Sequence, residues 1–207
     1  MKLSENYKKL TGKKGVFSIQ SIENIPSIMN YGILSNEEAK RFQHISIALE
    51  DVQRKRDLIK IPNHNRLHQY ANLYFDYWNP MLSKLRNKND QICLLSINPE
   101  ILDLHNVILS DRNAASSYAN YYSVEEGLKN LNFNQIFMKN WKSSDYYLEQ
   151  EQKSVKCAEI LVPNVVEYKY VLAAAVFNNN AANKLKEYGF NKNIYVKPEF
   201  FFGGQSC

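Results

Sequence analysis

One acidic residue, Glu159, lies in an otherwise apolar stretch of this chain, CAEILVP. Ionised carboxylates are seldom buried unless they are paired, because removing the charge from water costs free energy. A carboxylate that points from a strand into a polar cleft can serve as a general acid or base. In the alternative interpretation, Glu159 lies on the solvent face of an alternating strand and has no chemical role.

A basic cluster, Arg54, Lys55 and Arg56, is the second candidate for chemistry, in the segment DVQRKRDLIK. A guanidinium presents a fork of N–H donors that can hold a pyrophosphate. The alternative is a solvated helix face, which composition alone favours.

Aromatic residues are the third candidate, because the chain has 14 Tyr, 10 Phe and 2 Trp interleaved with Asn and Lys. Tyr74, Phe75, Tyr77 and Trp78 come almost consecutively. In a strand they would alternate between faces, so that one set packs in the core and the other offers a stacking surface for bases. The alternative is an aromatic-rich core without any ligand.

The histidine and cysteine spacings fit neither a metal site nor a Cys–His nucleophilic pair, and no glycine-rich phosphate loop of the Rossmann or P-loop kind is present. Three cysteines at wide spacings suit a reducing compartment. We expect Cys93 and Cys157 to be small buried residues and Cys207 to be a free thiol.

Length and composition predict a single domain over residues 1–207, with 44% hydrophobic residues to form its core. The first 15 residues, MKLSENYKKLTGKKG, read as a polar tail and not as a secretory signal. Apolar runs are far shorter than the ~20 residues that span a bilayer, so we expect a cytoplasmic protein. A net charge of +5 permits a polyanionic partner without requiring one.

The elements that must position these residues follow an α+β pattern. Segment 15–35 predicts a strand and then a helix that ends at Gly32, and 181–189 predicts a helix closed by Gly189. We expect a β-like start in 44–62, a possible helix after Asp111, and helical fragments forming a long active-site loop over 124–156. Strands are predicted within 67–78, 91–97, 106–110, 158–163, 168–177 and 193–202, with a short helix from Pro80.

In this order the segments resemble the motifs of the DarT family, the toxins of DarT–DarG toxin–antitoxin systems. The block LHQYANLYFDYWNPML is similar to the family's Leu-His-x-Tyr-x-x-x-Tyr-Phe-x-x-x-x-Pro-Met-Leu signature. GVFSIQSIENIPSIMNYGILS, ISIALEDVQRKRDLIKIP, VILSDRNAASSYANYY and KCAEILV resemble its other blocks, so the likeness runs from about Val16 to Phe202.

The resemblance implies an ADP-ribosyltransferase-like fold, with a central, mostly antiparallel split β-sheet core flanked by helices. It implies an NAD-dependent mono-ADP-ribosyltransferase that modifies a base of single-stranded DNA, uses no metal, and is neutralised by a DarG-like macrodomain antitoxin. The modified base, thymine or guanine, is left open. An acceptor in RNA or protein, or a non-catalytic nucleic-acid-binding module, are the alternatives.

Roles carried over from the family make Glu159 and Arg56 catalytic, with Arg54 as the other register for the arginine. The implied NAD-binding residues are Ser18, Gln20, Asn24, Arg56, Tyr70, Tyr74 and Phe75. The implied DNA-binding residues are Arg54, Trp78, Met81, Arg112 and Trp141, with residues of roughly 112–150 as the substrate-recognition loop. Ser18 and Gln20 depart from the family pattern, which has His and Thr at these places, where the His helps to hold the adenosine side of NAD.

Overall fold

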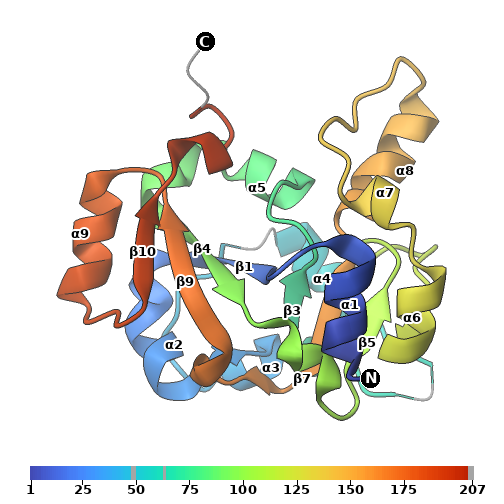
Figure 1. Ribbon diagram of the computed structural model, residues 1–207, viewed down its shortest axis with the longest axis horizontal. Coiled ribbons are helices and arrows are strands. Elements are labelled where there is room, and N and C mark those ends of the chain that lie inside the picture. Colours follow the sequence, from blue (N-terminus) through green and yellow to red (C-terminus); the bar gives the residue numbers. More distant parts are fainter. Residues whose placement is uncertain (48–49, 63, 205–207) are drawn as a thin grey trace.

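The computed structural model describes residues 1–47, 50–62 and 64–204. An eight-stranded sheet runs through its centre (Figure 1), and every neighbouring pair of its strands is antiparallel except β10 and β9. In spatial order the strands are β10 (Asn193–Val196), β9 (Val171–Val176), β4 (Ile92–Ile97), β1 (Val16–Ser21), β3 (Tyr70–Tyr74), β7 (Glu159–Pro163), β5 (Ile108–Ser110) and β6 (Tyr121–Ser123). The predicted α+β class is confirmed.

The sheet is split between β1 and β3. These strands share a single residue pair, Phe17 with Tyr74, whereas β1 pairs with β4 along its whole length and β3 does so with β7. Beyond that pair the two halves separate. A separate two-stranded ladder of β2 (Ile33–Leu34) and β8 (Val165–Val166) lies nearby.

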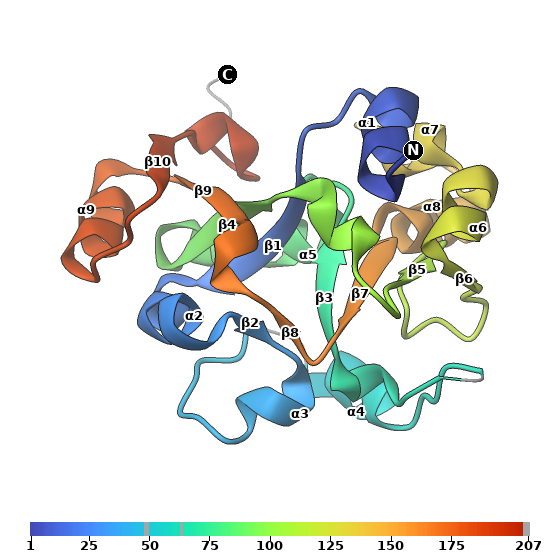
Figure 2. The ribbon, with the colours of Figure 1, turned by 60° about the horizontal axis from the view of Figure 1, so that its bottom comes forward.

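Helices flank both halves of the sheet (Figure 2). They are α1 (Leu3–Thr11), α2 (Ile25–Tyr31), α3 (Asn36–Ala39), α4 (Glu50–Asp57), α5 (Pro80–Lys84), α6 (Val124–Asn130), α7 (Phe133–Ile136), α8 (Tyr146–Lys156) and α9 (Asn179–Glu187). The main core joins the sheet to Ile25 and Ile28 of α2, Leu185 of α9, Tyr7 of α1 and Leu128 of α6. Gly32 and Gly189 follow helices with φ of +82° and +78°, as predicted.

Three local predictions are wrong. The N-terminal 15 residues are not a polar tail, because Leu3–Thr11 forms helix α1 and its Tyr7 is fully buried against Phe75 and Phe133. No strand forms over residues 44–47, and residues 48 and 49 of the expected β-like start lie outside the described residues. The segment after Asp111 forms turns and then β6 in place of a helix, since its polar side chains bond to nearby backbone groups.

Burial matches the prediction for two cysteines, Cys93 and Cys157, which are free and buried. Cys207 lies outside the described residues. Within the described ranges, no helix is long and apolar enough to cross a membrane.

Candidate active site in the split of the sheet

A cavity of about 270 Å³ opens where the two halves of the sheet separate. Ser18 and Gln20 line it from β1, while Tyr70, Asn72, Tyr74 and Glu159 line it from β3 and β7. Segments around α2, α3, α4 and α5 complete the wall. The cavity therefore brings together residues that are far apart in the sequence.

Glu159, at the start of β7, is the acidic centre of this cavity. Its side chain is 1% exposed, so the solvent-face interpretation is wrong. Arg56 Nη1 donates to both carboxylate oxygens at 3.0 Å, and the Ala114 backbone N–H donates to Oε1 at 2.9 Å. These contacts hold the carboxylate in place away from water. Oε1 accepts two hydrogen bonds and Oε2 accepts one, so Oε2 keeps more capacity for a substrate.

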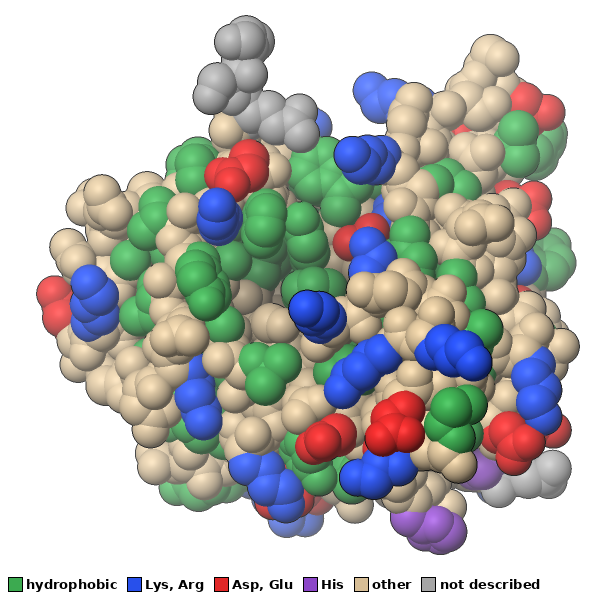
Figure 3. Space-filling view, viewed as in Figure 1, with side chains coloured by type: hydrophobic (Ala, Val, Ile, Leu, Met, Phe, Trp, Pro, Cys, Tyr) green, Lys and Arg blue, Asp and Glu red, His purple; other side chains and the backbone are tan. Residues whose placement is uncertain are grey.

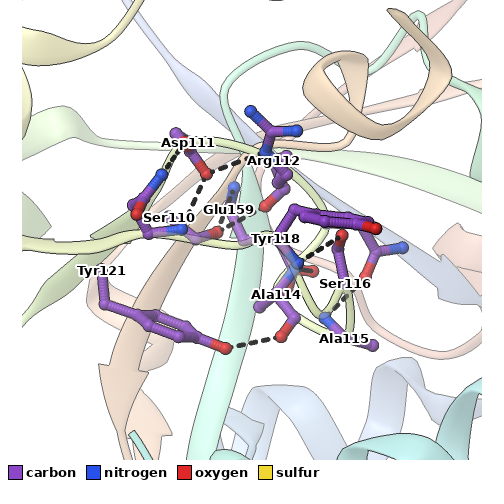
Figure 4. A network of polar contacts seen from close by, with 11 residues as sticks. Ser110, Asp111, Arg112, Ala114, Ala115, Ser116, Tyr118, Tyr121 and Glu159 are labelled. Carbon is purple, nitrogen blue, oxygen red and sulfur yellow. Dashed lines mark hydrogen bonds and ion pairs between the residues drawn. The ribbon is translucent and has the colours of Figure 1, made fainter. Parts of the chain in front are cut away.

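The turn before β6 is built to present the Ala114 N–H (Figure 4). Tyr121 Oη donates to the Ala114 carbonyl at 2.7 Å, and Asp111 accepts from both the backbone and the side chain of Asn120 at 3.0 and 2.8 Å. Ser110 Oγ accepts from the Glu159 N–H at 3.2 Å and donates to the Arg112 carbonyl at 2.7 Å. Burial, followed by the Glu159 charge, raises the pKa of Tyr121, so its hydroxyl stays a donor.

The two candidate arginines separate clearly. Arg56 is 6% exposed and reaches Glu159 from α4, whereas the Arg54 side chain is 72% exposed and pairs with Asp51 one turn away. Burial acts to lower the pKa of Arg56, but the adjacent Glu159 carboxylate outweighs it and raises that pKa. The guanidinium is therefore a permanent cation at this position.

His68 anchors the helix that carries Arg56. Its Nε2 lies 3.0 Å from Gln53 Oε1 and its Nδ1 lies 3.1 Å from Asp57 Oδ1, one helical turn apart on α4. Burial lowers the pKa of His68, and the bond to Asp57 partly opposes this. The sequence signal for His68 was its place in the Leu-His block, but no site role was predicted for it.

Predicted NAD-side residues lie around the split, with one exception. Ser18 is buried and accepts from Gln20 Nε2 at 2.8 Å, so these neighbours on one face of β1 form a polar pair in the cavity wall. Asn24 also lines the cavity, but both ends of its amide bond to Ile45, at 2.8 and 2.9 Å. Tyr70 and Tyr74 line the cavity, and burial raises the pKa of each hydroxyl.

Phe75 is the exception, because it does not reach the cavity. Tyr70, Asn72 and Tyr74 share the cavity face of β3, whereas Ala71, Leu73 and Phe75 are buried in the core. The prediction of Phe75 as an NAD contact is wrong for this reason. Asn72 was missed, although its alternation with the two tyrosines could have identified it.

Asn36 is another residue that sequence reasoning missed. It lines the cavity at the start of α3, and its Nδ2 donates to Gln53 Oε1 at 3.3 Å. Its Oδ1 is buried and has no hydrogen-bond partner among the described residues. Buried acceptors are normally satisfied, so this oxygen fits a site that receives a donor from a ligand.

The predicted DNA-binding residues are scattered. Met81 lines the cavity, Arg112 pairs with Asp111 at 3.3 Å, and Arg54 faces solvent. Trp78 stacks on Phe202 with ring centroids 3.8 Å apart, and Trp141 makes a T-shaped contact with the same ring, with centroids 5.7 Å apart. Trp141 is only 7% exposed, so it does not offer an open stacking face. The expected loop over 112–150 is divided between irregular segments and the elements β6, α6, α7 and the start of α8.

Lys156 fixes the last of these helices beside the site. Its fully buried ammonium pairs with Asp76 and donates to the Ile136 carbonyl at 2.7 Å, so it joins α8 and α7 to the segment after β3. Burial lowers the pKa of Lys156, and Asp76 opposes that shift. In the described part of the chain, no group of three or more His, Cys, Asp or Glu side chains is arranged so that it could bind a metal ion.

Comparisons with known proteins agree on one family. A family model described as "ssDNA thymidine ADP-ribosyltransferase, DarT" matches residues 17–202. A curated protein of Thermosipho africanus (strain H17ap60334), a DNA ADP-ribosyl transferase–DNA ADP-ribosyl glycohydrolase fusion, is 33% identical over 196 residues. These cover 90% of this chain and 49% of the relative, so the chain spans about half the length of that protein.

Solved structures extend the likeness to the fold. Thermosipho africanus DarTG in complex with ADP-ribose matches with a TM-score of 0.81 and 28% identity, over 92% of this chain and 51% of that one. Thermus sp. 2.9 DarT in complex with ADP-ribosylated ssDNA matches with a TM-score of 0.77 and 19% identity, over 91% and 96% of the two chains. The expected ADP-ribosyltransferase-like fold is confirmed.

Proposed function

This chain belongs to the DarT family, and from that premise we propose that it transfers ADP-ribose from NAD to thymidine in single-stranded DNA. The observation that carries the proposal is the Glu159 carboxylate, held by Arg56 and the Ala114 N–H in a cavity between the sheet halves. The Thermus relative has been solved with NAD+ and with ADP-ribosylated ssDNA, which supports the same donor and acceptor here.

The residues of the cavity suit a dinucleotide. Ser18, Gln20 and Asn72 supply polar groups along its wall, and Asn36 supplies an unpartnered acceptor for a hydroxyl or amino group. The Ser18–Gln20 pair stands where the family has His and Thr, so a hydroxyl and an amide replace the usual contacts. NAD is the substrate that supplies ADP-ribose, and no metal is part of the proposal.

The chemistry follows from the charges. The bond between the ribose and nicotinamide breaks, neutral nicotinamide leaves, and positive charge builds on the ribose as in glycoside cleavage. Glu159 stabilises that charge, and its less occupied Oε2 can accept the proton that the ring nitrogen of the base loses as it bonds to the ribose. Arg56 holds the Glu159 carboxylate in place through hydrogen bonds to both of its oxygens. An unpaired base exposes its ring nitrogen, whereas a duplex hides it.

The biological role belongs to the same proposal. The Thermosipho relative joins its transferase to a DNA ADP-ribosyl glycohydrolase, and this supports a toxin whose product is removed by a macrodomain partner. We place the activity in the cytoplasm, where NAD and transiently single-stranded DNA occur together.

The test is an incubation with labelled NAD and single-stranded oligonucleotides that each contain one kind of base, with RNA, duplex and protein controls. We expect label on thymidine oligonucleotides and its loss in Glu159→Gln, which keeps the shape of the side chain and removes its charge. Transfer to RNA or protein but not to DNA would overturn the acceptor. Undiminished transfer by Glu159→Gln would remove this residue from the mechanism, and absence of NAD binding to the wild type would favour a non-catalytic binding module.

A further inference from the structure

A second cavity, of about 290 Å³, lies on the sheet over β1, β4, β9 and β10. Its floor includes Ser96, Ala173 and Ala175, and its walls include Tyr77, Tyr195 and Phe200. We call it the alanine groove. Hydrophobic side chains gather around a hollow on this face of the molecule, with Lys and Arg side chains beside it (Figure 3). The catalytic proposal makes no use of this groove.

The groove shares a row of the sheet with the catalytic carboxylate. Residues directly opposite one another on adjacent strands project to the same face. The row runs through Glu159, Tyr74, Phe17, Ser96 and Ala173. With strands about 4.8 Å apart, Phe17 lies about 10 Å and Ala173 about 19 Å from Glu159 along the sheet. A polymer whose target unit lies at Glu159 can thus continue over the groove.

The side chains of the groove suit nucleobases. Tyr77 stacks on Phe200 at 4.8 Å between ring centroids and meets Phe17 edge-on at 5.0 Å, so these rings form a fixed wall. Tyr195 stands on β10 and is 49% exposed. The alanine floor leaves the space between these rings open, and flat bases of any identity can stack on such rings.

The charge at the groove suits a phosphate backbone. Lys197 lines the groove one residue after β10; its side chain is 45% exposed and its ammonium lies 3.2 Å from Glu199 Oε1. A partly exposed cation beside stacking rings is the combination that binds single strands without reading their sequence. The chain as a whole carries a net charge of +5.

We propose that the alanine groove binds nucleotides that flank the target base of the single-stranded DNA substrate. The inference rests on the proposed function, and it names where the rest of the strand lies. Bases stack between Tyr195 and the Tyr77–Phe200 wall, and Lys197 neutralises a phosphate. The groove thereby makes affinity depend on the length of the strand on one side of the target thymidine.

The experiment measures binding of fluorescent oligonucleotides by anisotropy, in a series extended one nucleotide at a time on either side of a single thymidine. We expect wild-type affinity to rise with extension in one direction. Tyr195→Ala and the groove-filling Ala173→Leu should lose that gain, with roughly tenfold weaker binding of long strands and unchanged binding of the shortest. Lys197→Ala should reduce the salt dependence by about one phosphate contact.

Val196→Ala is the matched control, because Val196 follows Tyr195 on β10, projects to the other face and is 39% exposed. It should bind every oligonucleotide as the wild type does. If Tyr195→Ala and Ala173→Leu, both shown to be folded by circular dichroism, keep the full length dependence, the proposal is overturned and the groove is left to a protein partner. If no strand is ADP-ribosylated but the length-dependent binding is lost in both variants, the proposed catalysis fails and the groove assignment stands.

Discussion

The residue that defines the site, Glu159, depends on Arg56 for the compensation of its buried charge. Both side chains are nearly inaccessible to water, and each would carry an uncompensated buried charge without the other. The pair is therefore a structural requirement of the site as well as a chemical one.

Removing one partner of this pair tests that requirement. We expect Arg56→Met to lower the free energy of unfolding by about 3–5 kcal/mol, because it leaves the Glu159 charge buried and unpaired. The double variant Arg56→Met with Glu159→Gln should be more stable than Arg56→Met alone, since no buried charge remains. Urea denaturation measures all three proteins. Arg54→Met is the matched control and should change stability by less than about 0.5 kcal/mol, because that side chain is exposed.

Asn36 offers a test of donor binding that does not touch the carboxylate. Its unpartnered Oδ1 should accept a hydrogen bond from NAD, so Asn36→Ala should raise the KM for NAD roughly three- to tenfold with little change in kcat. Asn36→Asp, which keeps an acceptor oxygen, should recover part of the affinity. Steady-state kinetics at saturating oligonucleotide separates KM from kcat, and an unchanged KM in Asn36→Ala would exclude this contact.

At the residue scale, side-chain chemistry was predictable where it broke a local pattern. Glu159 stood out because a single acid interrupted an apolar strand, and the family likeness selected Arg56 over Arg54, as the geometry does. Phe75 was assigned to the wrong face of β3, because a sequence motif gives the residue type at each position but not the face to which its side chain projects. The contact of the Ala114 N–H with Glu159 was not predictable. Every residue except proline has a backbone N–H, and only the conformation of the turn decides which one points to the carboxylate.

At the scale of elements, the short helix α4 brings Arg56 to Glu159, and His68 sets its position. The ring bridges Gln53 and Asp57 across one turn, so both anchors lie on the same side of α4 as Arg56. An eight-residue helix has little stability of its own and depends on such contacts.

Loss of that bridge should disorder α4 without unfolding the sheet. We expect His68→Ala to lower kcat at least tenfold and to speed tryptic cleavage after Arg54 and Lys55, which the helix protects in the wild type. His68→Gln can bond to one of the two anchors, so its kcat and its rate of tryptic cleavage should lie between those of the wild type and His68→Ala. His105→Ala, an exposed histidine outside the site, is the control and should change neither property. Wild-type rates of cleavage and catalysis in His68→Ala would show that α4 does not need the bridge.

Most strands and helix ends were predictable because their signals are local. Hydrophobic runs predict the apolar strands such as β4 and β7. Glycine favours the left-handed backbone that ends a helix, and this predicts the ends of α2 and α9. The turn after Asp111 was not predictable, since its conformation comes from side-chain bonds to the backbone such as Asp111 with Asn120. Helix α1 was missed because one buried tyrosine among lysines resembles a solvated tail.

At the scale of the whole molecule, the split in the sheet that forms the site was expected from the family likeness. The hydrophobic periodicity of the sequence does not predict it. Pairing between β1 and β3 depends on residues far apart in the sequence. The sequence of neither strand alone predicts that they share only one residue pair. The same sheet carries Glu159 on one side of the split and the alanine groove on the other, so one framework sets the distance between them.

Helix α1 contributes to that framework from the N-terminus. Tyr7 is fully buried, with its ring 6.0 Å from Phe75 and 6.2 Å from Phe133, and Ser4 Oγ donates to Asp103 at 2.5 Å. Phe75 follows Tyr74 directly, so the packing of Tyr7 supports the strand end that borders the active site.

Tyr7→Ala should therefore behave as a core substitution. We expect the free energy of unfolding to fall by about 3–5 kcal/mol, because a large ring is removed from between two aromatic neighbours and leaves a cavity. Leu10→Ala, on the same helix with 54% exposure, should cost less than about 0.5 kcal/mol and controls for helix propensity. Urea denaturation monitored by circular dichroism measures both. If Tyr7→Ala and Leu10→Ala have the same free energy of unfolding, α1 adds nothing to the core. In that case α1 would only touch the surface, and removing its aromatic ring would cost no packing.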